Sequence, residues 1–119
     1  MPQVILIEDD VLVRKLLEKR LRNAGWHVVA LPDGREMQAA LDAGGVDMLL
    51  IDMGLPYGDG LTLVQRIRSQ GITTPIMILT AYELPQLDEM VKRIGANDLM
   101  FKPYDQELLL ARMERMCAA

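Results

Sequence analysis

The stretch VILIEDD, from Val4 to Asp10, decides the fold of this chain, because it joins an aliphatic run directly to a cluster of acids. An uninterrupted aliphatic run is typical of a strand that is buried on both faces of a parallel sheet. The acids mark the point where this strand leaves the core. The stretch therefore predicts a central parallel strand, Val4–Ile7, with a polar carboxyl end.

Similar short apolar runs recur along the whole chain, and amphipathic stretches separate them. The expected strands are Val4–Ile7, His27–Ala30, Met48–Ile51, Ile76–Leu79 and Asp98–Phe101. The stretches between them have helical spacing: Leu87, Met90, Val91 and Ile94 would form one apolar face. Strands that alternate with helices through short connections predict an α/β protein, with one parallel sheet covered by helices on both faces.

Length and composition indicate one soluble globular domain over residues 1–119. Half of the 119 residues are hydrophobic and 25% are charged, and a chain of this length buries enough surface to fold alone. The net charge of −4 disfavours direct binding to nucleic acid. No apolar run is long enough to cross a membrane or form a signal peptide, and Cys117 is the only cysteine. We therefore expect a reducing, cytoplasmic setting.

Polar residues follow four of the five expected strands. In an open α/β sheet, ligands bind outside the carboxyl ends of the strands, so these residues would share one crevice. The residues at these ends are Glu8-Asp9-Asp10, Asp52, Thr80-Ala81 and Lys102-Pro103. Each of them alone is more often structural, as a solvated turn, a helix cap or a surface charge. Their joint position at four strand ends favours a functional site.

The chemistry of these residues predicts phosphoryl transfer. Carboxylates that converge on one crevice repel each other unless a cation neutralises them, and a set of oxygen ligands favours Mg²⁺ or Mn²⁺. The Thr80 hydroxyl and the Lys102 ammonium suit a phosphoryl oxygen. Asp52, on the central third strand, is then the candidate carboxylate nucleophile that would form a covalent phosphate.

These stretches resemble the receiver domain of bacterial two-component response regulators, and the resemblance covers essentially the whole chain. It is carried by residues 4–10, 50–56 with Asp59-Gly60, 75–81 and 95–104. The resemblance implies a flavodoxin-like fold of five strand–helix units, doubly wound, with a five-stranded parallel sheet in the order 2-1-3-4-5. It also implies a signalling domain, not an enzyme, that assists its own phosphorylation and dephosphorylation.

The resemblance assigns a role to each polar position. Asp52 would accept a phosphoryl group from a phosphohistidine of a sensor histidine kinase or a phosphotransfer protein. Asp9 would bind Mg²⁺ directly and Glu8 through water, and the carbonyl of Gly54 would supply a further ligand beside Asp52. Mn²⁺ could replace Mg²⁺.

The other positions of the motif also receive roles from the resemblance. Thr80, Lys102 and the backbone amide of Ala81 would contact the phosphoryl oxygens. Asp10 would face solvent or cap the first helix, and the Lys102-Pro103 peptide would be cis. The fourth helix, fifth strand and fifth helix form the expected output surface toward an output domain or a partner protein. A weak homodimer is a further expectation.

Two features depart from the family pattern. Leu99 stands where the family usually has Tyr or Phe, three residues before the lysine. That aromatic residue normally swings inward behind the displaced threonine. Gly54 and Tyr82, two residues past Asp52 and Thr80, flank the path of a hydrolytic water and should tune the lifetime of the phosphoryl group.

Three other functions fit parts of this sequence. A flavin mononucleotide protein would have a similar fold, but it needs a Gly/Ser/Thr-rich loop where this chain has Glu8-Asp9-Asp10. An aspartyl phosphatase would need a second acid two residues beyond Asp52, where Gly54 stands. A pseudo-receiver, an interaction module that is never phosphorylated, normally loses an acid or the lysine. Leu99 is the only feature that favours this alternative.

Overall fold

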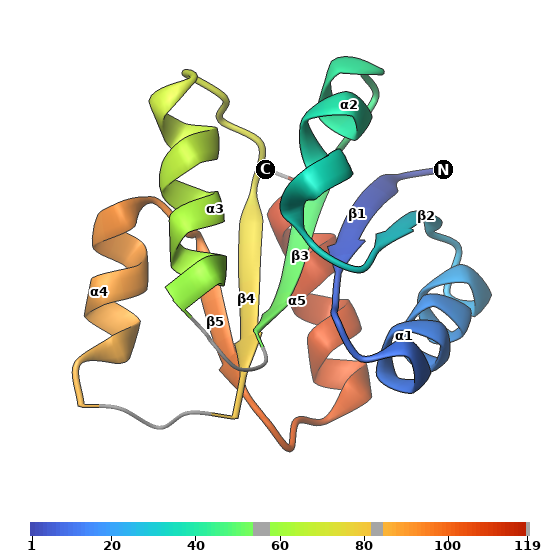
Figure 1. Ribbon diagram of the computed structural model, residues 1–119. Coiled ribbons are helices and arrows are strands. Elements are labelled where there is room, and N and C mark those ends of the chain that lie inside the picture. The colour runs from blue at the N-terminus through green and yellow to red at the C-terminus, as the bar shows by residue number, and fades with distance from the viewer. Residues whose placement is uncertain (54–57, 82–84, 119) are drawn as a thin grey trace.

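The computed structural model describes residues 1–53, 58–81 and 85–118. Strands and helices alternate along them (Figure 1). The strands are β1 (Gln3–Ile7), β2 (His27–Leu31), β3 (Met48–Met53), β4 (Ile76–Thr80) and β5 (Asp98–Phe101). The helices are α1 (Val11–Asn23), the 3-10 turn η1 (Gly34–Glu36), α2 (Met37–Asp42), α3 (Gly58–Ser69), α4 (Leu87–Ile94) and α5 (Gln106–Ala118).

The strands form one parallel sheet in the order β2-β1-β3-β4-β5, which confirms the expected flavodoxin-like topology. Because all strands run in the same direction, all carboxyl ends meet at one edge. The observed strands match the expected ones within two residues. The largest difference is at β3, which continues past Ile51 to Met53, so Asp52 lies inside the strand. Thr80 is likewise the last residue of β4.

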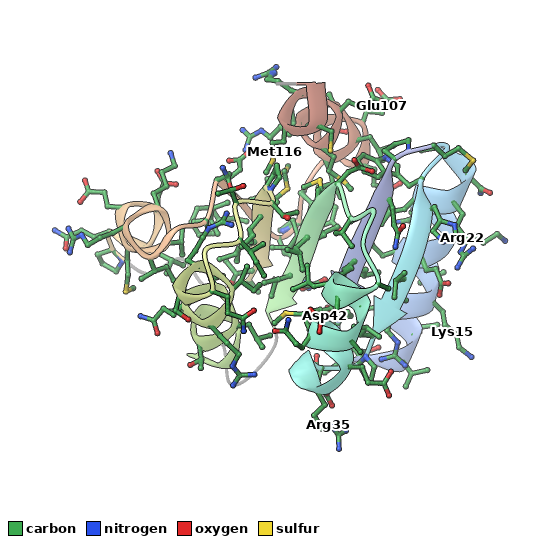
Figure 2. The ribbon with its side chains drawn as sticks, turned by 90° about the horizontal axis from the view of Figure 1, so that it is seen from above. Lys15, Arg22, Arg35, Asp42, Glu107 and Met116 are labelled. Carbon is green, nitrogen blue, oxygen red and sulfur yellow. The ribbon has the colours of Figure 1, made fainter. Side chains whose placement is uncertain are left out.

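The sheet separates two apolar cores, as the view along it shows (Figure 2). One core lies under α1 and α5, and its residues include Leu17, Leu21, Leu109 and Met113. The other lies under α2, α3 and α4, and its residues include Met37, Val64, Leu87 and Val91. Successive residues of a strand point to opposite faces, and β3 shows this directly: Leu50 belongs to the first core and Ile51 to the second.

The helix ends follow from local chemistry. The Asp10 side chain caps α1 by accepting a hydrogen bond from the Val13 amide, as expected for this residue. Gly95 ends α4 with a φ of 117°, a backbone conformation that residues with a Cβ rarely adopt. Among the described residues, no helix is long and apolar enough to cross a membrane.

Candidate functional site

Glu8 and Asp52 lie side by side because of the register between β1 and β3. Ile7 pairs with Ile51, so Glu8, directly after β1, lies opposite Asp52 of β3. The two residues are then one strand spacing apart, about 4.8 Å. By strand alternation both side chains point toward the face of α1 and α5. Only 3% of Glu8 and 4% of Asp52 is exposed. The register thus places two carboxyl groups together in a buried position.

The Asp52 carboxylate is paired with Lys102. Lys102 directly follows β5, and its Nζ forms an ion pair with Asp52 Oδ1. The Lys102 amide donates to the Thr80 carbonyl at 2.7 Å, so the backbone that carries the lysine is tied to the end of β4. The Lys102-Pro103 peptide is cis, as expected. Two residues that are far apart in sequence are therefore joined at the carboxyl edge of the sheet.

Glu8 is held by hydrogen bonds on three sides. Its amide donates to the Leu31 carbonyl at 3.0 Å, and its Oε1 accepts from the Asp10 amide at 2.9 Å. Its carbonyl accepts from Arg14 Nη1 at 2.8 Å. These contacts leave one carboxyl oxygen, Oε2, available toward Asp52. Glu8 is thus fixed within the acidic turn, whereas Asp9 and Asp10 are exposed.

The pKa of Glu8 is raised from 4.5 to about 8, mainly because the side chain is buried. The hydrogen bond to the Asp52 carboxylate and the negative charge of Asp52 contribute to this rise, while the Asp10 amide and the Lys102 ammonium oppose it. At neutral pH Glu8 therefore carries a proton, which lies between its own carboxyl group and that of Asp52. A cation that displaces this proton would meet two ionised carboxylates.

The carboxyl oxygens fit a hard divalent cation. Among the described residues, only the Lys102 ammonium and the shared proton of Glu8 reach Glu8 Oε2 and the two oxygens of Asp52, and no other donor satisfies them. Buried carboxylate oxygens with so few donors are unusual, and an oxygen-only ligand set suits Mg²⁺. In residues 1–53, 58–81 and 85–118 no three Asp, Glu, His or Cys residues surround one point. A pair of carboxylates still matches Mg²⁺, which usually keeps several waters.

The other expected site residues take different positions. Asp9 is exposed, unlike Glu8, and Gly54 lies outside the described residues. Thr80 is fully buried at the end of β4. It alternates with Ile76 and Ile78 and so lies on the face opposite Asp52. Ala81 is exposed at a bend directly after the strand.

The two departures from the family pattern lie in different places. Leu99 is 6% exposed and belongs to the core under α3 and α4, beside Leu87 and Val91. Its side chain is therefore packed inward in this structure. Tyr82 lies outside the described residues, as does Gly54.

Two residues near the site had no role in the sequence interpretation. Arg14 holds the acidic turn through the Glu8 carbonyl. Its position, one helical turn after Asp10, could have indicated this contact. Tyr104, which follows the cis proline, is half-buried. Its pKa is raised mainly by this burial and to a smaller extent by the negative charge of Asp52. Its phenol therefore stays neutral close to the acidic crevice.

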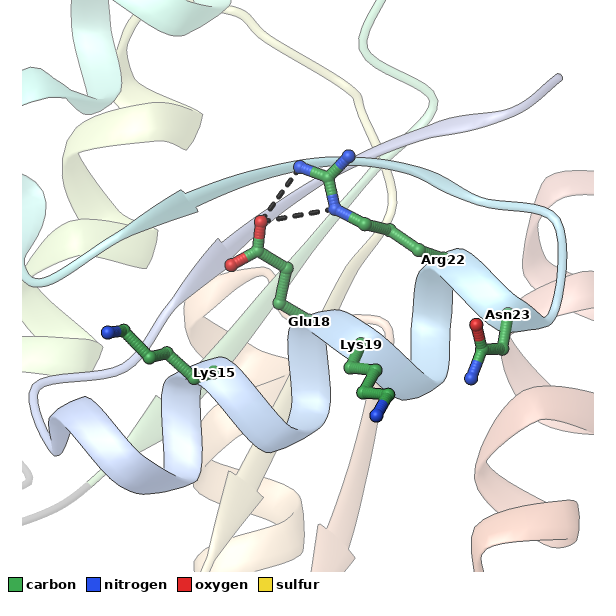
Figure 3. A pocket seen from close by; sticks show the side chains of 5 residues that line it. All are labelled: Lys15, Glu18, Lys19, Arg22 and Asn23. Carbon is green, nitrogen blue, oxygen red and sulfur yellow. Dashed lines mark hydrogen bonds and ion pairs between the residues drawn. The ribbon is translucent and has the colours of Figure 1, made fainter.

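A separate groove lies on the outer surface of α1 (Figure 3). It is lined by Lys15, Glu18, Lys19, Arg22 and Asn23, and a 2.7 Å ion pair joins Glu18 to Arg22. None of the expected site residues lines it. Three cations against one carboxylate make this part of an acidic protein locally basic.

Comparison with known proteins decides the family. The sequence matches the family described as response regulator receiver domain over residues 4–114. The chain belongs to this family. The match includes both carboxylates of the buried pair, the Thr80-Ala81 strand end and Lys102.

Named relatives of this receiver domain include transcriptional regulators. It is 38% identical over 116 residues to the virulence transcriptional regulatory protein PhoP of Salmonella choleraesuis, and 36% identical over 114 residues to PhoP of Escherichia coli. These alignments cover 98% and 96% of this chain but 52% and 51% of the relatives. The chain thus spans about half the length of the curated relatives it matches.

Solved receiver structures have the same fold. The BeF3-activated N-terminal receiver domain of Klebsiella pneumoniae RstA is 28% identical, with a TM-score of 0.88 over 98% of this chain and 99% of that one. The chemotaxis protein CheY4 of Vibrio cholerae is 30% identical, with a TM-score of 0.86 over 98% of both chains. The chain is therefore a signalling domain of the response regulator type.

Proposed function

We propose that this receiver domain, residues 1–119, is a switch that is phosphorylated on Asp52 in a Mg²⁺-dependent reaction. The observation that carries the proposal is the state of the Asp52 carboxylate. It is buried, its Oδ1 is ion-paired with Lys102, and no backbone amide among the described residues donates a hydrogen bond to either of its oxygens. A carboxylate with few hydrogen bonds and little hydration is a better nucleophile than a solvated one.

The donor is a phosphohistidine of a sensor histidine kinase or a phosphotransfer protein. An oxygen of Asp52 attacks the phosphorus, a P–O bond forms as the donor's P–N bond breaks, and the imidazole leaves with the electron pair. Lys102, which already contacts Asp52 Oδ1, pairs with the phosphoryl oxygens as negative charge spreads over them. The Thr80 hydroxyl, after it moves toward the phosphoryl group from the opposite face of the sheet, and the Ala81 amide are the further donors to these oxygens.

Glu8, Asp9, Asp52 and the Gly54 carbonyl would hold the Mg²⁺ ion. When bound, the ion neutralises the charge that develops on the phosphoryl oxygens. The scarcity of donors around the buried oxygens of Glu8 and Asp52 supports this assignment for two of the ligands. Asp9 is exposed and is therefore accessible to a hydrated cation.

The start of α1 is the surface on which a donor protein would dock. Leu12 is 67% exposed and Leu16 is 49% exposed, and Val11 beside them is exposed too. These apolar side chains directly follow the acidic turn, so a protein seated on them would reach Asp52. The conformational change on phosphorylation would be passed on at the surface of α4, β5 and α5. This surface would contact an output domain, such as the one in a transcriptional regulator, or a partner protein. We place this chemistry in the cytoplasm, and the domain itself does not contact nucleic acid.

The proposal is tested by incubation with acetyl phosphate and intact-mass analysis. One phosphoryl group per chain should appear with Mg²⁺ and should be absent in excess chelator. Lys102→Ala should slow the uptake, because the charge on the phosphoryl oxygens is then uncompensated. Phosphoryl uptake that is unchanged both by the chelator and by Lys102→Ala would refute the proposal.

The second candidate function is a pseudo-receiver, and Leu99 is the observation that favours it. Such a module would bind its partner equally well before and after treatment with acetyl phosphate. The same experiment separates the two functions, because a pseudo-receiver shows no Mg²⁺-dependent gain in mass.

A further inference from the structure

One guanidinium outside the site joins three segments of the chain. Arg68, in the last turn of α3, donates four hydrogen bonds with its five N–H groups. Its Nε donates to the Gly95 carbonyl at 2.8 Å, and its Nη1 donates to the carbonyls of Ile72 at 2.8 Å and Thr74 at 2.9 Å. Its Nη2 donates to Asn97 Oδ1 at 2.9 Å. Hydrogen bonds from a charged donor are stronger than neutral ones.

Two of these contacts reach the C-terminal end of α4, and the other two hold the loop between α3 and β4. Asn97 Oδ1 also accepts from the Ile76 amide at 2.9 Å, and the Asn97 amide donates to the Ile76 carbonyl at 2.8 Å. Gly95 lies directly under the arginine stem, because a Cβ at this position would be 2.6 Å from Arg68 Cγ. The end of α4 is thus tied both to α3 and to the first residue of β4.

The N-terminal end of α4 is held differently. Gln86, at the N-cap, has a φ of 63° and makes no side-chain capping bond, while Leu87 is buried in the core. A left-handed backbone at a residue other than glycine is strained. Figure 1 shows that this end of α4 lies at the edge where β4 ends, and that the Gly95 end lies at the opposite edge. One end of the helix is therefore clamped by charged hydrogen bonds, whereas the other end, as far as the described residues show, is held by the burial of Leu87.

We propose that Arg68 is the fixed pivot of α4. It pins the C-terminal end of the helix to α3 and β4, so a rearrangement that starts at the Asp52–Thr80 edge tilts α4 about Gly95. The displacement is then largest at Gln86 and Leu87. The part of this inference that concerns the tilt on activation rests on the proposed function, whereas the clamp itself does not.

Native-state hydrogen exchange tests the clamp. Arg68→Met keeps the aliphatic stem and removes every donor, and Arg66→Met, an exposed residue of the same helical turn, is the control. The amides of Ile76, Ala96 and Asn97 should exchange about tenfold faster in Arg68→Met than in the wild-type chain, with little change for Ile5 in β1. The control should leave all of them unchanged. Equal acceleration throughout the chain, or none at the three amides, would overturn the proposal.

Two additions keep the test decisive. If Arg68→Met does not fold, Arg68→Lys, which keeps the charge but not the fork of donors, takes its place. Hydrogen exchange at the same three amides should then be faster than in the wild-type chain, but by less than about tenfold. Beryllofluoride with Mg²⁺, a phosphoryl mimic, should change wild-type amide NMR shifts most at Leu87 and least at Asn97, and Arg68→Met should extend the changes to Asn97. Wild-type changes that are largest at Asn97 would contradict the pivot. A wild-type chain without any response would refute the proposed function, while hydrogen exchange would still decide the clamp.

Discussion

Replacing Glu8 by Gln should remove a pH-dependent cost from the metal-free protein. The folded-state pKa of Glu8 is raised from 4.5 to about 8, so its stabilising protonated form is fully present below pH 4.5 and is lost as the pH rises toward 8. Each pKa unit corresponds to about 1.4 kcal/mol, so full ionisation in the folded state costs on the order of 5 kcal/mol. Between pH 5 and pH 8 the wild-type chain should lose about 3 kcal/mol relative to Glu8→Gln.

Urea denaturation in chelator at several pH values measures this difference. The Gln side chain keeps an oxygen for the Asp10 amide and offers an N–H to Asp52, so the variant should be the more stable protein at pH 8. Comparison of the two proteins cancels the titration of all other groups. Parallel stability profiles for wild type and Glu8→Gln would show that Glu8 is not a buried, protonated acid and would refute the reasoning.

Three further predictions concern the cation, the switch and the donor. Asp9→Ala should weaken Mg²⁺ binding, measured by calorimetry, far more than Asp10→Ala. The Asp10→Ala variant should instead lose about 1 kcal/mol of folding stability, because it lacks the α1 cap. Equal losses of Mg²⁺ affinity would mean that the assignment of the acidic turn is wrong. Leu99→Tyr should keep phosphoryl uptake but change the beryllofluoride-induced amide shifts of α4, because the larger side chain must repack against Leu87 and Val91; identical shift maps would exclude position 99 from the coupling. Leu16→Glu should leave phosphoryl uptake from acetyl phosphate unchanged. It should slow phosphoryl transfer from an autophosphorylated histidine kinase that phosphorylates the wild-type chain. An unchanged rate of this transfer would exclude the start of α1 as the docking surface.

The fold was predictable from sequence because its strands are short, aliphatic and separated by amphipathic helices. The runs at Val4–Ile7 and Asp98–Phe101 predicted β1 within one residue and β5 without error. The end of β3 was less predictable. Asp52 was expected to follow the strand, but pairing with β4 extends the strand through Met53, and sequence propensity does not contain that tertiary contact.

The site was predictable only in part. Residue type and position at strand ends indicated Glu8, Asp52 and Lys102 as neighbours, and the structure brings these three together. The burial of Glu8 and the exposure of Asp9 depend on how β1 lies against β3, which sequence alone does not provide. The Arg68 contacts could not be predicted either, because they join residues that are distant in the chain and carry no motif.

Phosphopeptide mapping after treatment with acetyl phosphate and Mg²⁺ tests the central claim most directly. Asp52 should carry the only phosphoryl group, as a base-labile acyl phosphate, and Asp52→Asn should abolish it. Asp98, whose carboxylate is also ion-paired but lies at the amino end of β5, is the matched control, and Asp98→Asn should leave the modification intact. A phosphoryl group on any other residue, or undiminished uptake by Asp52→Asn, would contradict the account.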